Sequence, residues 1–194
     1  MNDWGFVKQE SAAAFWRDPS GDVISLNLFP ADEALPSLTD TQGLRAYCRR
    51  VATSQSSGLV EVTSAVGAEG PCVVYIYKRL RIPAFTFFGV IATPVPCGTW
   101  VWMIVAYERG TTGVREALVT SRLVNSGQLS LHSYEGSWAQ DPYDPSFRDV
   151  DRGTLRYISD AIEYDPDFPD HPLSKVRREL PRLLTIQLSG SPAA

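Results

Sequence analysis

The residues Ile82–Tyr107 form a run of 26 positions without a single charged side chain. Such a run is long enough to cross a bilayer as a helix, which takes roughly 20 apolar residues. Its centre, however, reads TPVPCG, and Pro94 and Pro96 would remove backbone donors and clash with the preceding turn of a helix. The flanking runs, Phe85–Ala92 and Trp100–Tyr107, are rich in aromatic and β-branched residues, which is typical of strands. We therefore predict a central β-hairpin that is covered on both faces.

Length and charge restrict the class of protein. A chain of 194 residues suits one domain, or one domain with an extension. The net charge of −4 and the pI of about 5.2 disfavour a general nucleic-acid binder, which needs a basic face to release counterions. Since proline interrupts the apolar run, we also expect no membrane partner.

The cysteines and the first residues indicate the compartment. Cys48, Cys72 and Cys97 are odd in number and far apart, and no C-x-x-C pair is present. This pattern favours free thiols over a disulfide framework or structural zinc. The opening residues, MNDWGFVKQE, lack a basic segment followed by an apolar one, so they do not resemble a secretion signal. We expect a cytoplasmic protein without a cofactor.

Strands and one helix are predicted before the central hairpin. A first hairpin is expected over Ser11–Arg17 and Val23–Phe29, because Pro and Gly lie between the two runs. A helix is expected over Thr39–Gln55, capped by Thr39 or Asp40. Its apolar stripe comprises Leu44, Tyr47, Cys48 and Val51, and its arginines, Arg45, Arg49 and Arg50, are expected in solvent. Strands are expected at Leu59–Val66 and Cys72–Leu80.

The segment Val114–Val124 suits a helix or a strand. A helix capped by Thr111 or Thr112 would place Val114, Ala117, Leu118 and Ser121 on one face. The letters ALVTSRLV also suit a pleated surface. The helix is the preferred interpretation, and the strand stays open at this point.

The last third of the chain differs in composition. Residues 135–170 hold ten acidic residues against three arginines, and prolines occur in DPYDPSF and EYDPDFPDHP. Two helices are predicted, Gly153–Glu163 and Ser174–Leu184, the second kinked at Pro181. We divide the chain into a core, 1–130, and an extension, 131–194, whose aromatic residues supply apolar area for docking. The predicted fold is α+β, an antiparallel sheet flanked by helices, or α/β/α sandwich, with an acidic, proline-rich C-terminal extension docked on it.

The order of these elements is similar to that of a known family. The helix Thr39–Gln55, the antiparallel strands from Leu59 to Tyr107 and the helix Val114–Val124 resemble the α/β/α sandwich of the PsbP-like proteins. That family includes the Ran-binding Mog protein and bacterial chaperones for secreted effectors. The resemblance covers residues 11–125, and it implies a binding role rather than one chemistry.

Two groups of residues point to chemistry. The acidic segment offers carboxylates for a cation, although it lacks the glycine and closing glutamate of the common calcium loop. These carboxylates are Asp141, Asp144, Asp149, Asp151, Asp165, Asp167 and Asp170. His132 and His171 are the only histidines, and no G-x-S-x-G motif accompanies them. We expect no bound metal, and we expect His171 at the entry of a helix.

Aromatic residues beside the acids suggest a surface for a partner. Protein interfaces use aromatic anchors with a polar rim, and the candidates are Tyr134, Trp138, Tyr143 and Phe168. The alternative is that these rings attach the extension to the sheet. The sequence favours a non-catalytic protein-binding module, similar to a chaperone or adaptor, with a protein partner. The alternative function is a small hydrolase or metal-dependent enzyme with its site near His132 and the acidic loops. The oligomeric state stays open.

Overall fold

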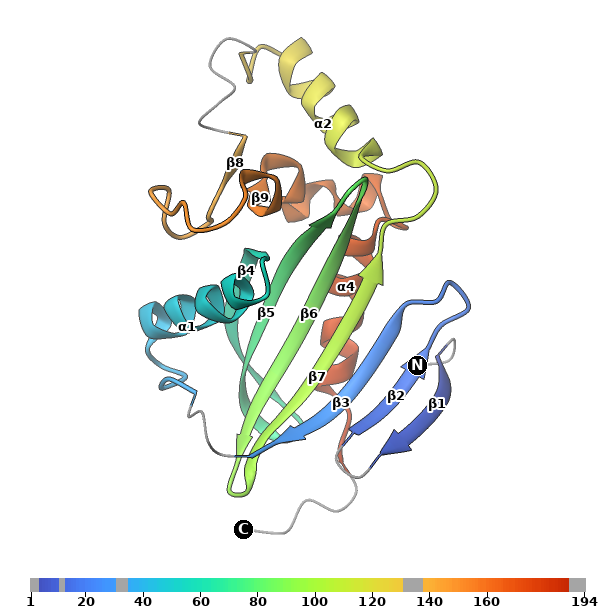
Figure 1. The fold of residues 1–194 in the computed structure, drawn as a ribbon, viewed down its shortest axis with the longest axis vertical. Helices are drawn as coiled ribbons and strands as arrows, with labels where there is room; N and C mark the ends of the chain where they lie inside the picture. Colours follow the sequence, from blue (N-terminus) through green and yellow to red (C-terminus); the bar gives the residue numbers. More distant parts are fainter. Residues whose placement is uncertain (1–3, 11–12, 31–34, 131–137, 189–194) are drawn as a thin grey trace.

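A computed structural model describes residues 4–10, 13–30, 35–130 and 138–188 of the chain. Seven strands form one antiparallel sheet in the order β1-β2-β3-β7-β6-β5-β4 (Figure 1). The strands are β1 (Gly5–Glu10), β2 (Ala13–Arg17), β3 (Val23–Phe29), β4 (Gly58–Gly67), β5 (Gly70–Arg81), β6 (Ala84–Val95) and β7 (Gly98–Tyr107). β3 pairs with β7, so the chain after β3 crosses to the far edge of the sheet before β4 begins.

The charge-free run folds as the predicted hairpin. β6 and β7 pair in continuous register from Thr86 opposite Tyr107 to Val95 opposite Gly98. They lie in the centre of the sheet, where both neighbours supply backbone partners. Within the described ranges, no helix is long and apolar enough to cross a membrane.

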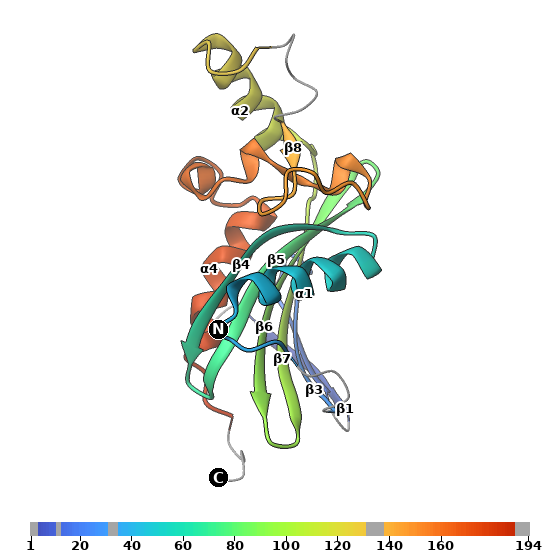
Figure 2. The same ribbon diagram turned by 90° about the vertical axis from the view of Figure 1, so that its left-hand side faces the viewer.

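Two helices cover opposite faces of the sheet and confirm the α/β/α sandwich. α1 (Thr41–Ser54) packs on β4 and β5, and α4 (Pro172–Leu184) packs on β6 and β7. Figure 2 shows α1 and α4 on opposite sides of the strands. We call the α1 side the front face and the α4 side the back face. The C-terminal third of the chain thus supplies the back layer.

The two covering helices follow from local sequence. Asp40 accepts a hydrogen bond from the Gly43 N–H and caps α1, as one of the two predicted caps. The helix buries Leu44, Cys48 and Ala52 at four-residue intervals. In α4 the apolar residues Leu173, Val176, Leu180 and Leu183 are buried on the sheet. α4 continues through Pro181, which is exposed, to Leu184.

α2 (Val114–Asn125) is a helix, as preferred, but its predicted cap and inner face are wrong. The residue before it is Gly113, which lies in the left-handed region and offers no side-chain cap. The buried residues are Arg115 and Val119, whereas Val114 and Leu118 are exposed. The reason is its position: α2 lies beyond the end of the sheet and contacts the C-terminal turns rather than the strands (Figure 1).

The predicted helix at Gly153–Glu163 is wrong. This region forms three short 3-10 helices and a two-stranded ladder of β8 (Ala139–Gln140) and β9 (Arg156–Tyr157). The 3-10 helices are η2 (Arg152–Thr154), η3 (Ile158–Asp160) and η4 (Ile162–Asp167). Aspartate side chains accept bonds from nearby backbone N–H groups here, for example Asp151 from Gly153 and Asp160 from Tyr157. Such bonds compete with regular helix.

Candidate functional site

The structure places the predicted aromatic residues in separate surroundings. His132 and Tyr134 lie outside the described residues. Trp138 is buried, with its ring centroid 5.8 Å from that of Tyr157. Phe168 is half-buried, with the Arg115 guanidinium 5.8 Å from its ring centroid.

Tyr143 attaches the C-terminal segment to the edge strand β4. Its hydroxyl accepts a hydrogen bond from the Val62 N–H at 2.7 Å and donates to the Val62 carbonyl at 3.2 Å. The Arg45 guanidinium lies 4.1 Å from its ring centroid. These contacts occupy backbone groups that an edge strand otherwise exposes. Tyr143 therefore has a structural role in this arrangement.

Several acidic residues proposed for a cation site bind arginines instead. Asp141, whose side chain is fully buried, accepts two hydrogen bonds from Arg49, at 2.9 and 2.7 Å. Arg49 was expected in solvent, and this contact to a residue far along the chain corrects that expectation. Asp165 is paired with Arg115 and Arg177. The acidic middle of the extension is thus neutralised in large part by the folded chain.

The end of the sheet beneath α2 contains a fully buried ion pair. The Lys78 ammonium lies 2.6 Å from Asp160 Oδ2, and neither side chain is exposed. The ammonium also lies 3.4 Å from the ring centroid of Tyr157. Burial lowers the pKa of Lys78, although Asp160 opposes that shift. The pair joins β5 to the C-terminal turns.

Arg115 extends this network from α2. Its guanidinium, which is fully buried, donates to the carbonyls of Ser159 and Ala161 and to the side chains of Asp165 and Ser174. These bonds anchor α2 on the turns before α4. A planar guanidinium with this many partners fixes orientation as well as charge.

His171 lies at the start of α4, as predicted. Its Nδ1 accepts a hydrogen bond from the Leu173 N–H at 3.3 Å, so it caps the helix. Burial lowers its pKa to about 3, which keeps the ring neutral near pH 7. Within the described residues this hydrogen bond goes to backbone, not to a serine hydroxyl, so a hydrolytic triad is not assembled around His171.

The front face is the least covered apolar surface of the sheet. α1 lies over β4 and β5, and no helix lies over β2, β3 and β7 on that side in Figure 1. On β7, Val101, Met103 and Val105 are half-buried, whereas the alternate residues Trp102 and Ile104 are buried against the back layer. The prediction that the hairpin is covered on both faces is therefore correct for the back face and only partly correct for the front.

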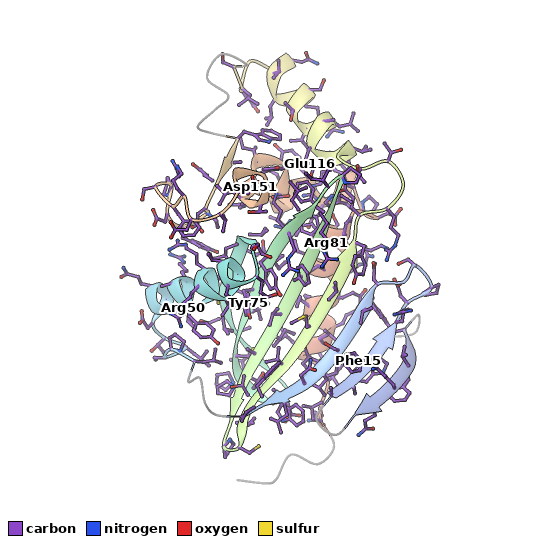
Figure 3. The ribbon with its side chains drawn as sticks, viewed as in Figure 1. Phe15, Arg50, Tyr75, Arg81, Glu116 and Asp151 are labelled. Carbon is purple, nitrogen blue, oxygen red and sulfur yellow. The ribbon has the colours of Figure 1, made fainter. Side chains whose placement is uncertain are left out.

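A groove of about 360 Å³ runs between α1 and this open region. The described residues of its lining are uncharged and comprise Phe29, Pro30, Leu35, Tyr47, Val51, Gln55, Tyr75, Tyr77, Ala92, Thr99, Val101 and Met103. Figure 3 shows Tyr75 near α1 and Phe15 on β2, toward the far side of the open region. Aromatic and methionine side chains of this kind supply large contact areas for a partner.

The charged side chains that the structure describes on the front face of the strands are basic. The strand register places Arg17, Arg79 and Arg81 on the front face. α1 adds Arg45 and Arg50, whereas its third arginine, Arg49, is already paired with Asp141. Among the front-facing strand side chains that the structure describes, none is acidic. A chain with net charge −4 therefore presents a basic rim around an apolar surface.

A sequence signal for this surface was present but ambiguous. β7 is apolar at nearly every position, which indicates two apolar faces without showing which of the two faces another element covers.

No protein-family model matches the chain, and no curated protein matches it. The resemblance to PsbP-like proteins therefore stays a prediction.

Proposed function

We propose that this protein is a non-catalytic binding module that holds an acidic, amphipathic segment of a partner protein on its front face. The observation that supports the proposal is the open apolar half of that face with its basic rim. Exposed or half-exposed apolar patches with a polar border are characteristic of interaction surfaces.

The charge of the rim favours a partner of opposite sign. Arg17 and Arg81 are exposed, and Arg79 lies between the groove and Arg81 on β5. Opposite potentials accelerate association and disfavour wrong partners. An amphipathic segment matches both features, because its apolar side fits the groove and its carboxylates reach the arginines.

Capture experiments with matched variants test this function. A photo-crosslinking residue replaces Met103 in each protein compared, and each protein is incubated with extract of the native cell. The otherwise wild-type protein is compared with a charge variant that carries both Arg17→Glu and Arg81→Glu. Leu118→Gln on α2, an exposed apolar residue away from the face, is the control. We expect crosslinked proteins with wild type and control, and loss of them with the charge variant at unchanged melting temperature.

Two results would contradict the proposal. If wild type and charge variant crosslink the same proteins, or if wild type crosslinks none, the front face is not the binding surface. If nucleic acid is crosslinked instead and nuclease removes the signal, the basic rim serves a different class of partner.

A further inference from the structure

Three potential metal ligands meet where β7 ends and α2 and α4 begin. Glu108 follows β7 directly, Glu116 lies in the first turn of α2, and His171 precedes α4. One ligand atom from each residue lies within 4.8 Å of the other two. Figure 3 shows Glu116 where α2 approaches the end of the sheet. This position is remote from the open part of the front face.

Two of these side chains have buried polar atoms that lack a hydrogen-bond partner among the described residues. Neither carboxylate oxygen of Glu116, nor Nε2 of His171, has a hydrogen-bond partner among the described residues. The His171 side chain is only 8% exposed and the Glu116 side chain 12%, and Nε2 lies 4.0 Å from Glu116 Oε1. Lys78, which interacts electrostatically with Glu116, is already bonded to Asp160. Buried polar atoms of this kind normally have a partner, so a ligand between them is indicated.

Two backbone N–H groups fix the position of the Glu108 carboxylate. Its Oε2 accepts a hydrogen bond from the Phe85 N–H at 2.9 Å, and its Oε1 accepts one from the Gly113 N–H at 2.6 Å. Each carboxylate oxygen retains a further lone pair. Outer contacts that orient a carboxylate in this way are a common feature of metal sites.

We propose that Glu108, Glu116 and His171 bind one divalent transition-metal cation, with Zn²⁺ as the fitting ion. One imidazole and two carboxylates match the ligand types that Zn²⁺ accepts, at about 2.0–2.2 Å from the metal. The ligand atoms must therefore approach one another by about 1 Å or more from their present separation. Glu116, whose carboxylate oxygens have no hydrogen-bond partner among the described residues, makes this movement by turning its side chain.

Binding also changes the role of His171. A neutral imidazole that ligates through Nε2 carries its proton on Nδ1, so the bond from the Leu173 N–H is given up. That bond is long, at 3.3 Å, and a coordinate bond replaces it. The cap of α4 and the cation are thus mutually exclusive partners of His171.

Three protein ligands leave a coordination position open on Zn²⁺. Glu108 and His171 line a cleft of about 500 Å³, which Arg109 and Lys175 also border. Glu116 lines a neighbouring groove beside α2. The cleft provides a path for the cation and space for a water on the open position.

Titration calorimetry on protein freed of metal by a chelator and dialysed tests this site. Zn²⁺, Mn²⁺ and Mg²⁺ are compared in a Cys97→Ser background, because Cys97 is exposed and thiolates are good ligands for Zn²⁺. The variants are Glu116→Gln and His171→Asn, the latter because Asn also caps helices. Asp149→Asn, at an exposed acidic residue, is the control for net charge.

We expect one Zn²⁺ to bind per chain and the melting temperature to rise with Zn²⁺. The affinity for Zn²⁺ should be at least tenfold weaker in Glu116→Gln and in His171→Asn, and unchanged in Asp149→Asn. X-ray absorption of the loaded protein should show nitrogen and oxygen ligands, including one imidazole. Absence of stoichiometric binding would overturn the proposal. So would wild-type affinity for Zn²⁺ in either ligand variant that folds, or a sulfur ligand in the absorption spectrum of the loaded protein.

Discussion

The two faces of the central hairpin are both apolar in sequence but differ in how they are covered. On the back face, Phe87 and Ile104 are at most 1% exposed beneath α4. On the front face, α1 covers the β4–β5 side, and Met103 and Val105 stay half-buried. Both sets of residues come from the same hairpin. Apolar alternation therefore predicts burial only where a second element lies over the strand, and an uncovered apolar half-face is available for a partner.

The largest expected difference between the two faces is the loss in free energy of unfolding when a side chain is truncated to alanine. Phe87→Ala should cost about 3–5 kcal/mol and Ile104→Ala about 2–5 kcal/mol, because both lose transfer energy and leave a cavity. Met103→Ala and Val105→Ala should cost less, about 1–2 kcal/mol, since part of each removed group already contacts solvent. Denaturant midpoints with constant slopes measure these costs. Equal losses on the two faces would show that the front face is covered after all.

A smaller effect is expected where the front layer meets the C-terminal segment. Asp141→Asn should cost about 1–3 kcal/mol, because the buried carboxylate accepts two bonds from Arg49 and two from backbone N–H groups. Asp149→Asn, at an exposed position, is the matched control. Limited proteolysis between 138 and 152 reports the docking. Cleavage should be slow for wild type at low and high salt and faster for Asp141→Asn; rapid cleavage of wild type at both salts would contradict docking.

The smallest effect concerns alkaline pH and the front layer. Burial raises the pKa of Cys48 from 9.0 to about 12. Its contribution to stability is fully present below pH 9.0 and is lost as the pH rises toward 12, because the unfolded thiol ionises first. Wild type should therefore lose about 1 kcal/mol more than Cys48→Ala between pH 8 and pH 10. Cys97→Ser should follow wild type; parallel curves for all three proteins would show that Cys48 is not buried in solution.

The elements that depend on a local apolar pattern could be predicted from the sequence. The proline-centred run predicted the central hairpin and the apolar stripe predicted α1, but the resemblance, which ends at residue 125, did not include α4, the helix that covers the back face. The inner face of α2 was not predictable in this way, because one of its two buried residues is Arg115, whose partners lie 44 or more positions away. The helix predicted at Gly153–Glu163 is wrong because aspartate side chains accept hydrogen bonds from nearby backbone N–H groups in this region.

The candidate sites show the same limit. Glu108, Glu116 and His171 carry no spacing motif, and only the fold brings His171 to the two glutamates. Phe168 and Tyr143, predicted from the sequence as partner-binding residues, contact Arg115 and β4 in the structure. The open front face depends on where α1 packs on the sheet, and the sequences of the strands do not determine that position.

The most direct test of the account is hydroxyl-radical footprinting of the purified chain, read residue by residue by mass spectrometry. Met103 on the front face and Trp102 on the back face are adjacent in β7, so they share the same backbone stability. The account predicts rapid oxidation of Met103 and, on the front face of β2, of Phe15, with slow oxidation of Trp102 and Phe87. Each rate is compared with that of the same residue in the unfolded chain, which removes differences in intrinsic reactivity. Protection of Met103 equal to that of Trp102 would contradict the claim that the front face is open.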